Sequence, residues 1–537
     1  MATITRRQSE HSPNRIAWAP DRPDHCGLES THHTTEITLT TGTLNVTEDP
    51  TALARQLSGL NLVDGQLVPA ISKRTFPVIN PATGRHIADA ADGDSDDVEH
   101  AVGVAVRAQV AWARLPARER GRLLSEAARR LTSHTEEVAR LVALETGKAL
   151  RTESRPEISA TADALNFFAG LAPELKGETV PLKPGALTYT TREPVGVVGV
   201  IVPWNVPVLI MAFKIAPALI AGNAVVVKSA EEAPLGALRV IQILNSVLPP
   251  GVLNILSGDG PACGGPLANH PAVRKITFTG SVETGRIIAH AAAEKLIPAT
   301  LELGGKSPMI VMPDADLAQV VEGAVAGMRF TRQGQSCTAA SRMLVHSQVH
   351  DEFVRRLSER VDAMVMGDPL DEATDIGTIV SRPQFEKVKY YIELGQAQQG
   401  AKAIRCAKLP GDPALAQGFF LQPVIFTGLT NKSRLAREEI FGPVTCVLRF
   451  DTLDEAIAMA NDSDYGLAAT VWTKDLKTAL SAAQRLEAGL VQINQNQVAG
   501  PNISYGGIKQ SGMGKELSLE SMLDHFTHKK TVIVNLE

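Results

Sequence analysis

The chain has 537 residues, of which 44% are hydrophobic and 21% are charged, and its formal net charge is −5. This balance excludes collagen-like, fibrous and wholly disordered proteins, and the length suffices for two or three domains. The 53 basic and 58 acidic residues leave no excess of cations for binding a nucleic-acid backbone, so we expect a small-molecule substrate and no nucleic acid.

The cysteines are spread over the whole chain and are too few for a disulfide framework. We therefore expect a reducing, cytoplasmic environment in which each thiol is judged by its own surroundings. The sequence contains no CxxC pair and no cluster of histidines and cysteines at metal-ligand spacing, so we expect no metal site. The cysteines are Cys26, Cys263, Cys337, Cys406 and Cys446.

Residues 1–58 are rich in Thr, Ser, His and Pro and lack apolar periodicity, which predicts a flexible N-terminal arm. Arg6, Arg7 and Glu10 are not followed by an apolar block, so we expect no signal peptide. Acidic residues such as Glu29 argue against a cleaved organelle presequence.

Residues 95–150 are predicted to form a helical scaffold, because acidic residues stand at the start and apolar residues recur at helical spacing. Residues 194–213 carry no charge and are long enough to span a bilayer. Pro203 and Pro207 interrupt this stretch, and valine and isoleucine fill its first half. We therefore interpret it as a buried strand followed by a sharp turn, and we expect no membrane span.

Strands and helices alternate in the next part of the chain. Short runs rich in valine and isoleucine are separated by stretches long enough for one crossover helix each, which is typical of a parallel sheet covered on both faces. The expected fold class is therefore α/β with a doubly wound parallel sheet, and ligands should bind beyond the carboxyl ends of its strands. The runs are residues 195–202, 224–228, 252–256, 275–278 and 300–303.

A second α/β region begins with a helical stripe over residues 317–328, which ends at a polar loop over residues 331–337. Cys337 closes this loop among small and polar residues, where a thiolate would be accessible. On the residues alone, an inert thiol is the more common case. Asn205 equally suits a turn between prolines, and Glu302 equally suits an exposed strand end.

Seven motifs extend from residue 78 nearly to the C-terminus. They are Val78-Ile79-Asn80-Pro81-Ala82-Thr83-Gly84, Pro203-Trp204-Asn205, Phe278-Thr279-Gly280-Ser281, Leu301-Glu302-Leu303-Gly304-Gly305-Lys306-Ser307-Pro308, Phe330-Thr331-Arg332-Gln333-Gly334-Gln335-Ser336-Cys337, Glu438-Glu439-Ile440-Phe441-Gly442-Pro443 and Ser511-Gly512-Met513-Gly514-Lys515-Glu516. Together and in this order, they resemble the NAD(P)-dependent aldehyde dehydrogenase superfamily of the hydrolytic, non-acylating type. The fold that this resemblance implies has a cofactor domain, an α/β catalytic domain and a small β oligomerisation element.

An aldehyde cannot expel hydride directly, because this would leave an acylium ion, so a nucleophile must add first. The resemblance implies that the Cys337 thiolate adds, and that the Asn205 amide and the backbone N–H of Cys337 bind the oxyanion. It also implies that Glu302 activates the water that hydrolyses the thioester. Lys214 and Glu516 are implied to pass protons to solvent, although both equally suit solvated charges.

The resemblance further implies NAD as the cofactor, with NADP less favoured. Lys228 and Glu231 would hold the adenine ribose, where a carboxylate repels a 2′-phosphate. Gly280 and Ser281 precede a helix whose N-terminus suits the pyrophosphate, although Ser281 equally suits a simple N-cap. The other implied cofactor-binding residues are Trp204, Gly258, Gly304, Glu439 and Phe441.

Two alternative functions stay open. An acylating family member would pass the acyl group to coenzyme A, but such members typically lack a glutamate at the position of Glu302. A catalytically inactive, structural family member is the other alternative, and the combination of Cys337, Glu302 and Asn205 argues against it.

The substrate region departs from familiar family members. Val206 stands where many members have an aromatic residue, and residues 494–504, the expected substrate loop, carry neither an aromatic side chain nor a cation. We therefore expect a neutral, fairly bulky aldehyde. Arg332 is the counterexample, because it stands near Cys337 and is either an anchor for a carboxylate or a structural arginine.

The C-terminal residues 530–534 alternate as a strand with an apolar edge. In the family such a strand pairs across subunits with a segment resembling residues 172–194, which implies a homodimer or homotetramer. The expected division of the chain is an arm over 1–58, an NAD-binding domain over 59–171 and 195–303, a catalytic domain over 304–508, and oligomerisation strands over 172–194 and 523–537.

Overall fold

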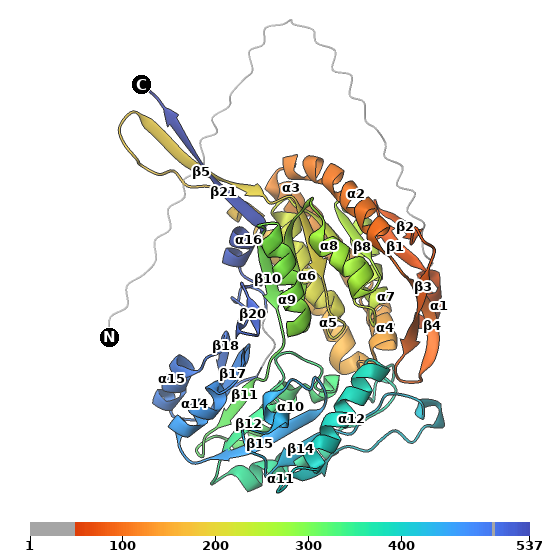
Figure 1. Ribbon diagram of the computed structural model, residues 1–537, viewed down its shortest axis with the longest axis vertical. Coiled ribbons are helices and arrows are strands. Elements are labelled where there is room, and N and C mark those ends of the chain that lie inside the picture. The colour runs from red at the N-terminus through yellow and green to blue at the C-terminus, as the bar shows by residue number, and fades with distance from the viewer. Residues whose placement is uncertain (1–48, 497–499) are drawn as a thin grey trace, which may run out of the picture. The chain divides into compact units, whose positions relative to one another are not determined.

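The computed structural model describes residues 49–496 and 500–537 (Figure 1). Its first element is helix α1 (Pro50–Gln56), and Leu53 and Leu57 are completely buried in the core. The Asp49 side chain accepts a hydrogen bond from the N–H of Thr51 and so caps this helix. The expectation of an arm up to residue 58 is therefore wrong at its C-terminal end, while residues 1–48, with Cys26, lie outside the described residues.

The predicted helical scaffold is confirmed. It consists of α2 (Ser95–Arg114), α3 (Ala117–Ser133) and α4 (Thr135–Thr146). A capping box between Asp94 and Asp97 starts α2. A short π-helical turn, η1 (Leu150–Ser154), then leads into α5 (Arg155–Gly170), and this junction contributes side chains to the site described below.

The first sheet contains the five predicted parallel strands, in the order β8-β7-β6-β9-β10. Helices α6 (Pro207–Ile220), α7 (Pro234–Asn245), α8 (Gly265–Asn269) and α9 (Val282–Glu294) alternate with them, so the doubly wound arrangement is confirmed. The strands are β6 (Val197–Ile201), β7 (Ala224–Lys228), β8 (Leu253–Leu256), β9 (Val273–Thr279) and β10 (Ala299–Glu302).

Both edges of this sheet carry antiparallel strands that the pattern of apolar runs did not predict. The hairpin of β1 (Leu60–Val63) and β2 (Gln66–Pro69) extends the sheet beside β8. At the other edge β20 (Gly512–Met513) pairs with β10, so a C-terminal segment returns to the end of the strand that carries Glu302. A separate hairpin joins β3 (Thr75–Asn80) and β4 (Arg85–Ala91).

The charge-free stretch forms β6, a turn and the start of α6, as predicted. Pro207 occupies the first turn of α6, where its missing N–H breaks no helical hydrogen bond. Among the helices of the described residues, none has the length and apolar composition needed to cross a membrane.

The second sheet has the order β13-β14-β15-β12-β11-β17-β18, and only β13 runs antiparallel to its neighbour. Its strands are β11 (Pro308–Val311), β12 (Arg342–His346), β13 (Lys402–Arg405), β14 (Val424–Thr427), β15 (Val444–Phe450), β17 (Ala468–Trp472) and β18 (Leu490–Ile493). The helices that accompany it are α10 (Leu317–Met328), α11 (His350–Asp362), α12 (Arg382–Gln396), α14 (Leu453–Asn461) and α15 (Leu476–Arg485). The helix predicted over residues 317–328 is thus confirmed residue by residue.

A two-stranded ribbon of β5 (Ala186–Pro194) and β21 (Thr527–Asn535) extends away from both sheets (Figure 1). The strand predicted at the C-terminus is confirmed, but β21 pairs with β5 of the same chain, from Thr527 opposite Pro194 to Asn535 opposite Ala186. The expected pairing of these two segments across subunits is therefore wrong for this edge, because β5 of the same chain already occupies it. Helix α16 (Leu519–Phe526) directly precedes β21.

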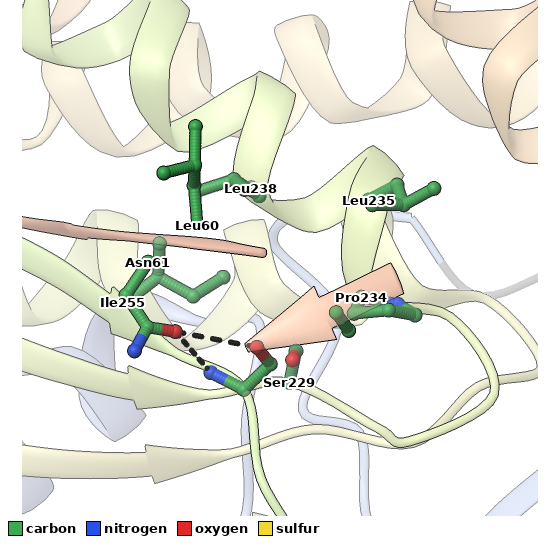
Figure 2. Close-up of a pocket in the computed structure, with 9 residues that line it drawn as sticks. Leu60, Asn61, Ser229, Pro234, Leu235, Leu238 and Ile255 are labelled. Carbon is green, nitrogen blue, oxygen red and sulfur yellow. Dashed lines mark hydrogen bonds between the residues drawn. The ribbon is translucent and has the colours of Figure 1, made fainter. Parts of the chain in front are cut away.

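A small cavity lies between β1, β8 and the start of α7, lined by Leu60, Leu235 and Leu238 among others (Figure 2). Its volume is about 10 Å³, which is room for one water molecule. The Asn61 side-chain oxygen accepts hydrogen bonds from the N–H and hydroxyl of Ser257, at 2.8 and 3.2 Å. These hydrogen bonds attach the β1–β2 hairpin to the sheet. The cavity is too small to hold a substrate.

Candidate active site

Cys337 lies in a loop between α10 and β12 whose backbone conformation is fixed by its surroundings. Arg329, Gln333 and Gly334 all have positive φ angles, of 56°, 56° and 64°. A Cβ atom at Gly334 would lie 2.2 Å from the carbonyl oxygen of Gly442, so only glycine fits there. The Gln335 side chain accepts from the N–H of Val380 and donates to two backbone carbonyls, which holds the loop in place before Cys337.

The thiol of Cys337 lines a cavity of about 440 Å³. Four of the five residues predicted to be catalytic line it, namely Cys337, Glu302, Asn205 and Glu516, and the fifth, Lys214, is buried behind Glu516. Apolar side chains of α6 form one wall of the cavity; they are Leu209, Ile210 and Phe213. Such a volume suits a small organic substrate.

Glu302 ends β10 and is 5% exposed, so it is not the exposed strand-end glutamate of the alternative interpretation. Neither oxygen of its carboxyl group has a hydrogen-bond partner in the described part of the chain. Burial raises the pKa of Glu302 well above its usual value, the charge of Glu516 raises it further, and Lys214 and Lys515 lower it. The side chain thus keeps a proton at a pH where an exposed glutamate has lost it.

Burial also raises the pKa of the Cys337 thiol, to about 11, although a contact with Tyr505 and the charge of Arg332 lower it. The Tyr505 hydroxyl lies 3.8 Å from the sulfur. The charges of Glu439 and Glu302 both raise the pKa of Cys337, which places the two carboxyl groups within electrostatic range of the sulfur. The thiol is therefore protonated at neutral pH in this arrangement and needs a base.

Asn205 and the backbone of Cys337 supply two donors near the sulfur. The Asn205 side chain is buried and donates to the carbonyl of Gln335 at 3.2 Å, which leaves its second amide hydrogen available. The N–H of Cys337 donates to no other group in the part of the chain that the structure describes. Asn205 therefore does more than turn the chain between two prolines.

Lys214 and Glu516 form a buried pair. The Lys214 ammonium lies 2.7 Å from a carboxylate oxygen of Glu516, and Thr277 bonds to both groups. Glu516 is held beside Tyr505 by two backbone hydrogen bonds between the two residues. Both charges are thus buried rather than solvated, which contradicts the alternative interpretation of this pair.

The residues predicted to bind the cofactor lie at strand ends outside this cavity. At the end of β7 the Lys228 ammonium contacts a carboxylate oxygen of Glu231 at 2.7 Å, and the Glu231 side chain is 42% exposed. Ser281 caps α9 by accepting a hydrogen bond from the N–H of Thr284. Gly258 and Gly280 are required by packing, since a Cβ atom would lie 2.4 Å from Gly93 and Phe278 respectively.

Two further residues predicted to bind the cofactor, Trp204 and Phe441, contact each other. The rings of Trp204 and Phe441 pack edge to face with centroids 5.2 Å apart. The Glu439 carboxylate accepts a hydrogen bond from the N–H of Gly305 at 2.9 Å, and a Cβ atom at Gly304 would collide with it at 2.3 Å. Burial raises the pKa of Glu439, and this N–H and nearby lysines lower it.

Residues 68–532 match the model of the aldehyde dehydrogenase family. The chain belongs to this family. Hydroxyisobutyraldehyde dehydrogenase of Mycolicibacterium austroafricanum is 42% identical over 89% of this chain and 94% of its own length. Human mitochondrial aldehyde dehydrogenase is 43% identical over 87% of this chain and 90% of its own length.

Solved structures of aldehyde dehydrogenases share the fold. The NAD⁺ complex of the Bacillus cereus aldehyde dehydrogenase is 37% identical, covers 92% of this chain and all of its own, and superposes with a TM-score of 0.87. Betaine aldehyde dehydrogenase of Staphylococcus aureus, solved with NAD⁺, is 36% identical over 90% of this chain and 96% of its own, with a TM-score of 0.86. The predicted family and fold class are therefore confirmed.

Within the aldehyde dehydrogenase fold, the structure decides between the two interpretations of Arg332. Its guanidinium donates to Glu153 at 2.8 Å through Nε and makes a second, closer contact through a terminal nitrogen. Glu153 also accepts from the hydroxyl of Thr331. Because its charge is committed to Glu153, Arg332 acts as a structural arginine that ties the Cys337 loop to η1.

Three cavity residues of this aldehyde dehydrogenase were missed from the sequence. Tyr505 directly follows the expected substrate loop and contacts the thiol, so extending that loop by one residue would have found it. Glu157 pairs with buried Lys148 and accepts from the N–H groups of Val208 and Leu209 at the start of α6. Arg329 was missed because it is the residue directly after α10, and no local feature of the sequence marks it.

Proposed function

We propose that this aldehyde dehydrogenase oxidises an aldehyde to a carboxylic acid with NAD, through a thioester on Cys337. The observation that carries the proposal is that three groups line one cavity: the Cys337 thiol, the buried Asn205 amide, and the Glu302 carboxyl group, which has no hydrogen-bond partner among the residues described. Acyl transfer of this kind needs a nucleophile, a base and an oxyanion donor at one place.

The first step is addition of the Cys337 sulfur to the carbonyl carbon, which gives a thiohemiacetal. The thiol proton passes to a base, and Glu302 is the candidate, because its charge acts on the sulfur and its carboxyl group has no hydrogen-bond partner among the described residues. The second amide hydrogen of Asn205 and the N–H of Cys337 would bind the new oxyanion, because both donors are held in place before substrate arrives.

The residues at the first sheet fit NAD. Glu231 has an exposed carboxylate oxygen beside Lys228, suited to accept from ribose hydroxyls, and Ser281 opens a helix whose N-terminal N–H groups suit a pyrophosphate. Glu439, with Phe441 and Trp204, lies where a nicotinamide riboside would approach the Cys337 loop. When bound, NAD would accept the hydride that leaves the substrate carbon.

Hydrolysis completes the turnover. Glu302 takes a proton from water, the resulting hydroxide adds to the thioester carbon, and the carbon–sulfur bond breaks with return of a proton to Cys337. The buried Lys214–Glu516 pair stands next to Glu302 and offers a route by which that carboxyl group exchanges its proton with solvent. Hydrolysis needs the ionised form of Glu302, so its raised pKa makes the step slower at low pH.

The proposal includes a homodimer or homotetramer built on the β5–β21 ribbon. Large apolar side chains of the ribbon are exposed, including Leu187, Ile533 and Val534 at 43%, 61% and 37%. Exposed apolar surface of this kind is typical of an interface between subunits. We also propose a reducing, cytoplasmic setting, supported by four free cysteines among the described residues, three of them buried.

The experiment is a panel of aldehydes incubated with the purified protein and NAD, with NADH followed by absorbance. We expect NADH and free acid in equal amounts without added coenzyme A. A requirement for coenzyme A, with a thioester as the released product, would replace this proposal by the acylating alternative. No NADH from any aldehyde of the panel would contradict the proposal altogether.

A further inference from the structure

Arg329 ends α10 in the left-handed conformation, with a φ of 56°. Glycine or asparagine usually takes this position at the end of a helix, because a longer side chain costs about 1 kcal/mol or more there. Two backbone hydrogen bonds to its carbonyl, from Arg332 and Gly334, hold the residue in this conformation. The fold therefore keeps an arginine where a smaller residue would be less strained.

The Arg329 side chain lines the same cavity as Cys337 and has no hydrogen-bond or ion-pair partner among the described residues. Glu153, the carboxylate within electrostatic range, is already committed to Arg332 and Thr331. Burial lowers the pKa of Arg329, and Arg332 lowers it further, while the charges of Glu153, Tyr505 and Cys337 raise it. A partly buried cation without an acceptor is costly, and an anion in the cavity would offset that cost.

A second donor at the same end of α10 also lacks an acceptor. The side-chain amide nitrogen of Asn496 is buried and has no hydrogen-bond partner within residues 49–496 and 500–537, and Asn496 lines the cavity. It packs on Gly327, where a Cβ atom would collide with the amide. Arg329 and Asn496 thus supply two donors to one cavity at the end of α10, and a carboxylate is a ligand that can accept from both.

The carboxylates in the cavity do not oppose an anionic substrate. Glu153, Glu157 and Glu516 are each paired with a buried cation, which are Arg332, Lys148 and Lys214. The raised pKa of Glu302 keeps that group protonated over much of the pH range. Asp163 is the remaining carboxylate that lines the cavity, and it is exposed on α5.

Taking the proposed function as given, we infer that Arg329, with Asn496, binds a carboxylate at the far end of the substrate, so that the enzyme prefers aldehydes that are also acids. This replaces the expectation of a neutral aldehyde, which rested on Val206 and on the lack of a cation in residues 494–504. The proposed anchor, Arg329, lies eight residues before Cys337, whereas Arg332 lies five residues before it. The ion pair with Glu153 distinguishes Arg332 from Arg329.

The test compares kcat/KM for 4-oxobutanoate and 5-oxopentanoate with kcat/KM for their methyl esters, which have the same aldehyde group and no charge. We expect the acid-to-ester ratio of the wild-type enzyme to exceed one for at least one chain length. Arg329→Gln should lower that ratio about 10- to 100-fold, the range for a lost charge-assisted hydrogen bond. Asn496→Ala should lower it less, about 3- to 10-fold.

Two further variants separate binding from structure. Arg329→Lys keeps a cation and should retain more of the ratio than Arg329→Gln, which a purely structural arginine would not predict. Arg122→Gln removes an exposed arginine of α3 and should leave both rates unchanged. A wild-type ratio below one for both acids, or an unchanged ratio in Arg329→Gln, would overturn the inference. Failure of acids and esters alike to give NADH would instead contradict the proposed function.

Discussion

The two ends of the Cys337 cavity differ in whether their buried carboxyl groups are hydrogen-bonded. At the α5 end, every buried carboxylate is satisfied: Glu153 binds Arg332 and Thr331, and Glu157 binds Lys148 and the start of α6. At the reaction end, neither oxygen of the Glu302 carboxyl group has a hydrogen-bond partner among the described residues. Buried polar groups are normally hydrogen-bonded, so the exceptions mark where a substrate or water is expected.

This difference separates structural from chemical roles within a single site. A buried carboxylate that is paired with a cation has a structural role, because removing either partner leaves the other charge buried without compensation. A carboxylate without partners destabilises the fold at neutral pH but can accept a proton in the reaction. Substitutions on the two ends should therefore change different measurements.

The largest effect is expected from Cys337→Ser. A serine hydroxyl in the same position is a much weaker nucleophile than a thiolate, so kcat should fall at least about 10⁴-fold. Steady-state NADH formation with saturating aldehyde measures it. Cys446→Ser, at a buried thiol of β15, is the matched control and should keep the wild-type kcat. Turnover within tenfold of wild type in Cys337→Ser would contradict the nucleophile assignment.

Glu302→Gln should lower kcat about 10²- to 10⁴-fold, because general base catalysis of this size is lost. One equivalent of NADH should still form in a burst, since addition and oxidation precede hydrolysis. The unfolding midpoint at pH 8 should stay the same or rise. A carboxyl group whose pKa is raised in the fold contributes stability only below its unfolded pKa, and this is lost as the pH rises. A clearly lower midpoint would show that Glu302 is a structural residue.

Glu157→Gln tests the other end of the cavity. It leaves Lys148 buried without its carboxylate partner, so the free energy of unfolding should fall by about 3–5 kcal/mol. Urea denaturation followed by circular dichroism measures this loss. Asp163→Asn, on the same helix but exposed, should change stability by less than about 0.5 kcal/mol. Equal losses in both variants would remove the contrast between the two ends.

The pH dependence of thioester hydrolysis sharpens the contrast at Glu302. The rate should rise with pH through a pKa well above the usual glutamate value of about 4.3, because the ionised form is the base. The charge of Lys214 lowers the pKa of Glu302, so Lys214→Met should move this rise to higher pH. Single-turnover decay of the acyl-enzyme gives the profile. A shift to lower pH would contradict the assigned electrostatics.

The smallest effect is expected at the cofactor end. Glu231→Gln removes the charge that would repel a 2′-phosphate, so the preference for NAD over NADP should fall about tenfold. The ratio of kcat/KM for the two cofactors measures it, with Glu232→Gln next to it as the control. An unchanged ratio would show that Glu231 does not contact the ribose.

The sequence predicted the parts of the fold that depend on local pattern. Buried parallel strands are continuous apolar runs, so residues 224–228 matched β7 and residues 317–328 matched α10 without error. The antiparallel additions were missed, because β20 has only two residues and is defined by its pairing with β10. Helix α1 was missed because its seven residues follow a stretch of polar composition.

The site residues likewise divide into those that sequence motifs predict and those that only the fold identifies. Cys337, Glu302 and Asn205 stand in sequence motifs and could be named from them. The distinction between Arg329 and Arg332 could not, because it depends on Glu153, 179 residues away from Arg332 along the chain. Burial, pairing and the loss of partners are properties of the folded chain that no spacing in the sequence reports.

The most direct test is the mass of the Glu302→Gln protein after it reacts with aldehyde and NAD. We predict one added acyl group per chain, located by peptide mass spectrometry on the peptide that contains Cys337 and removed by hydroxylamine. An unmodified Cys337 peptide after a full burst of NADH, or an acyl group on another residue, would contradict the account.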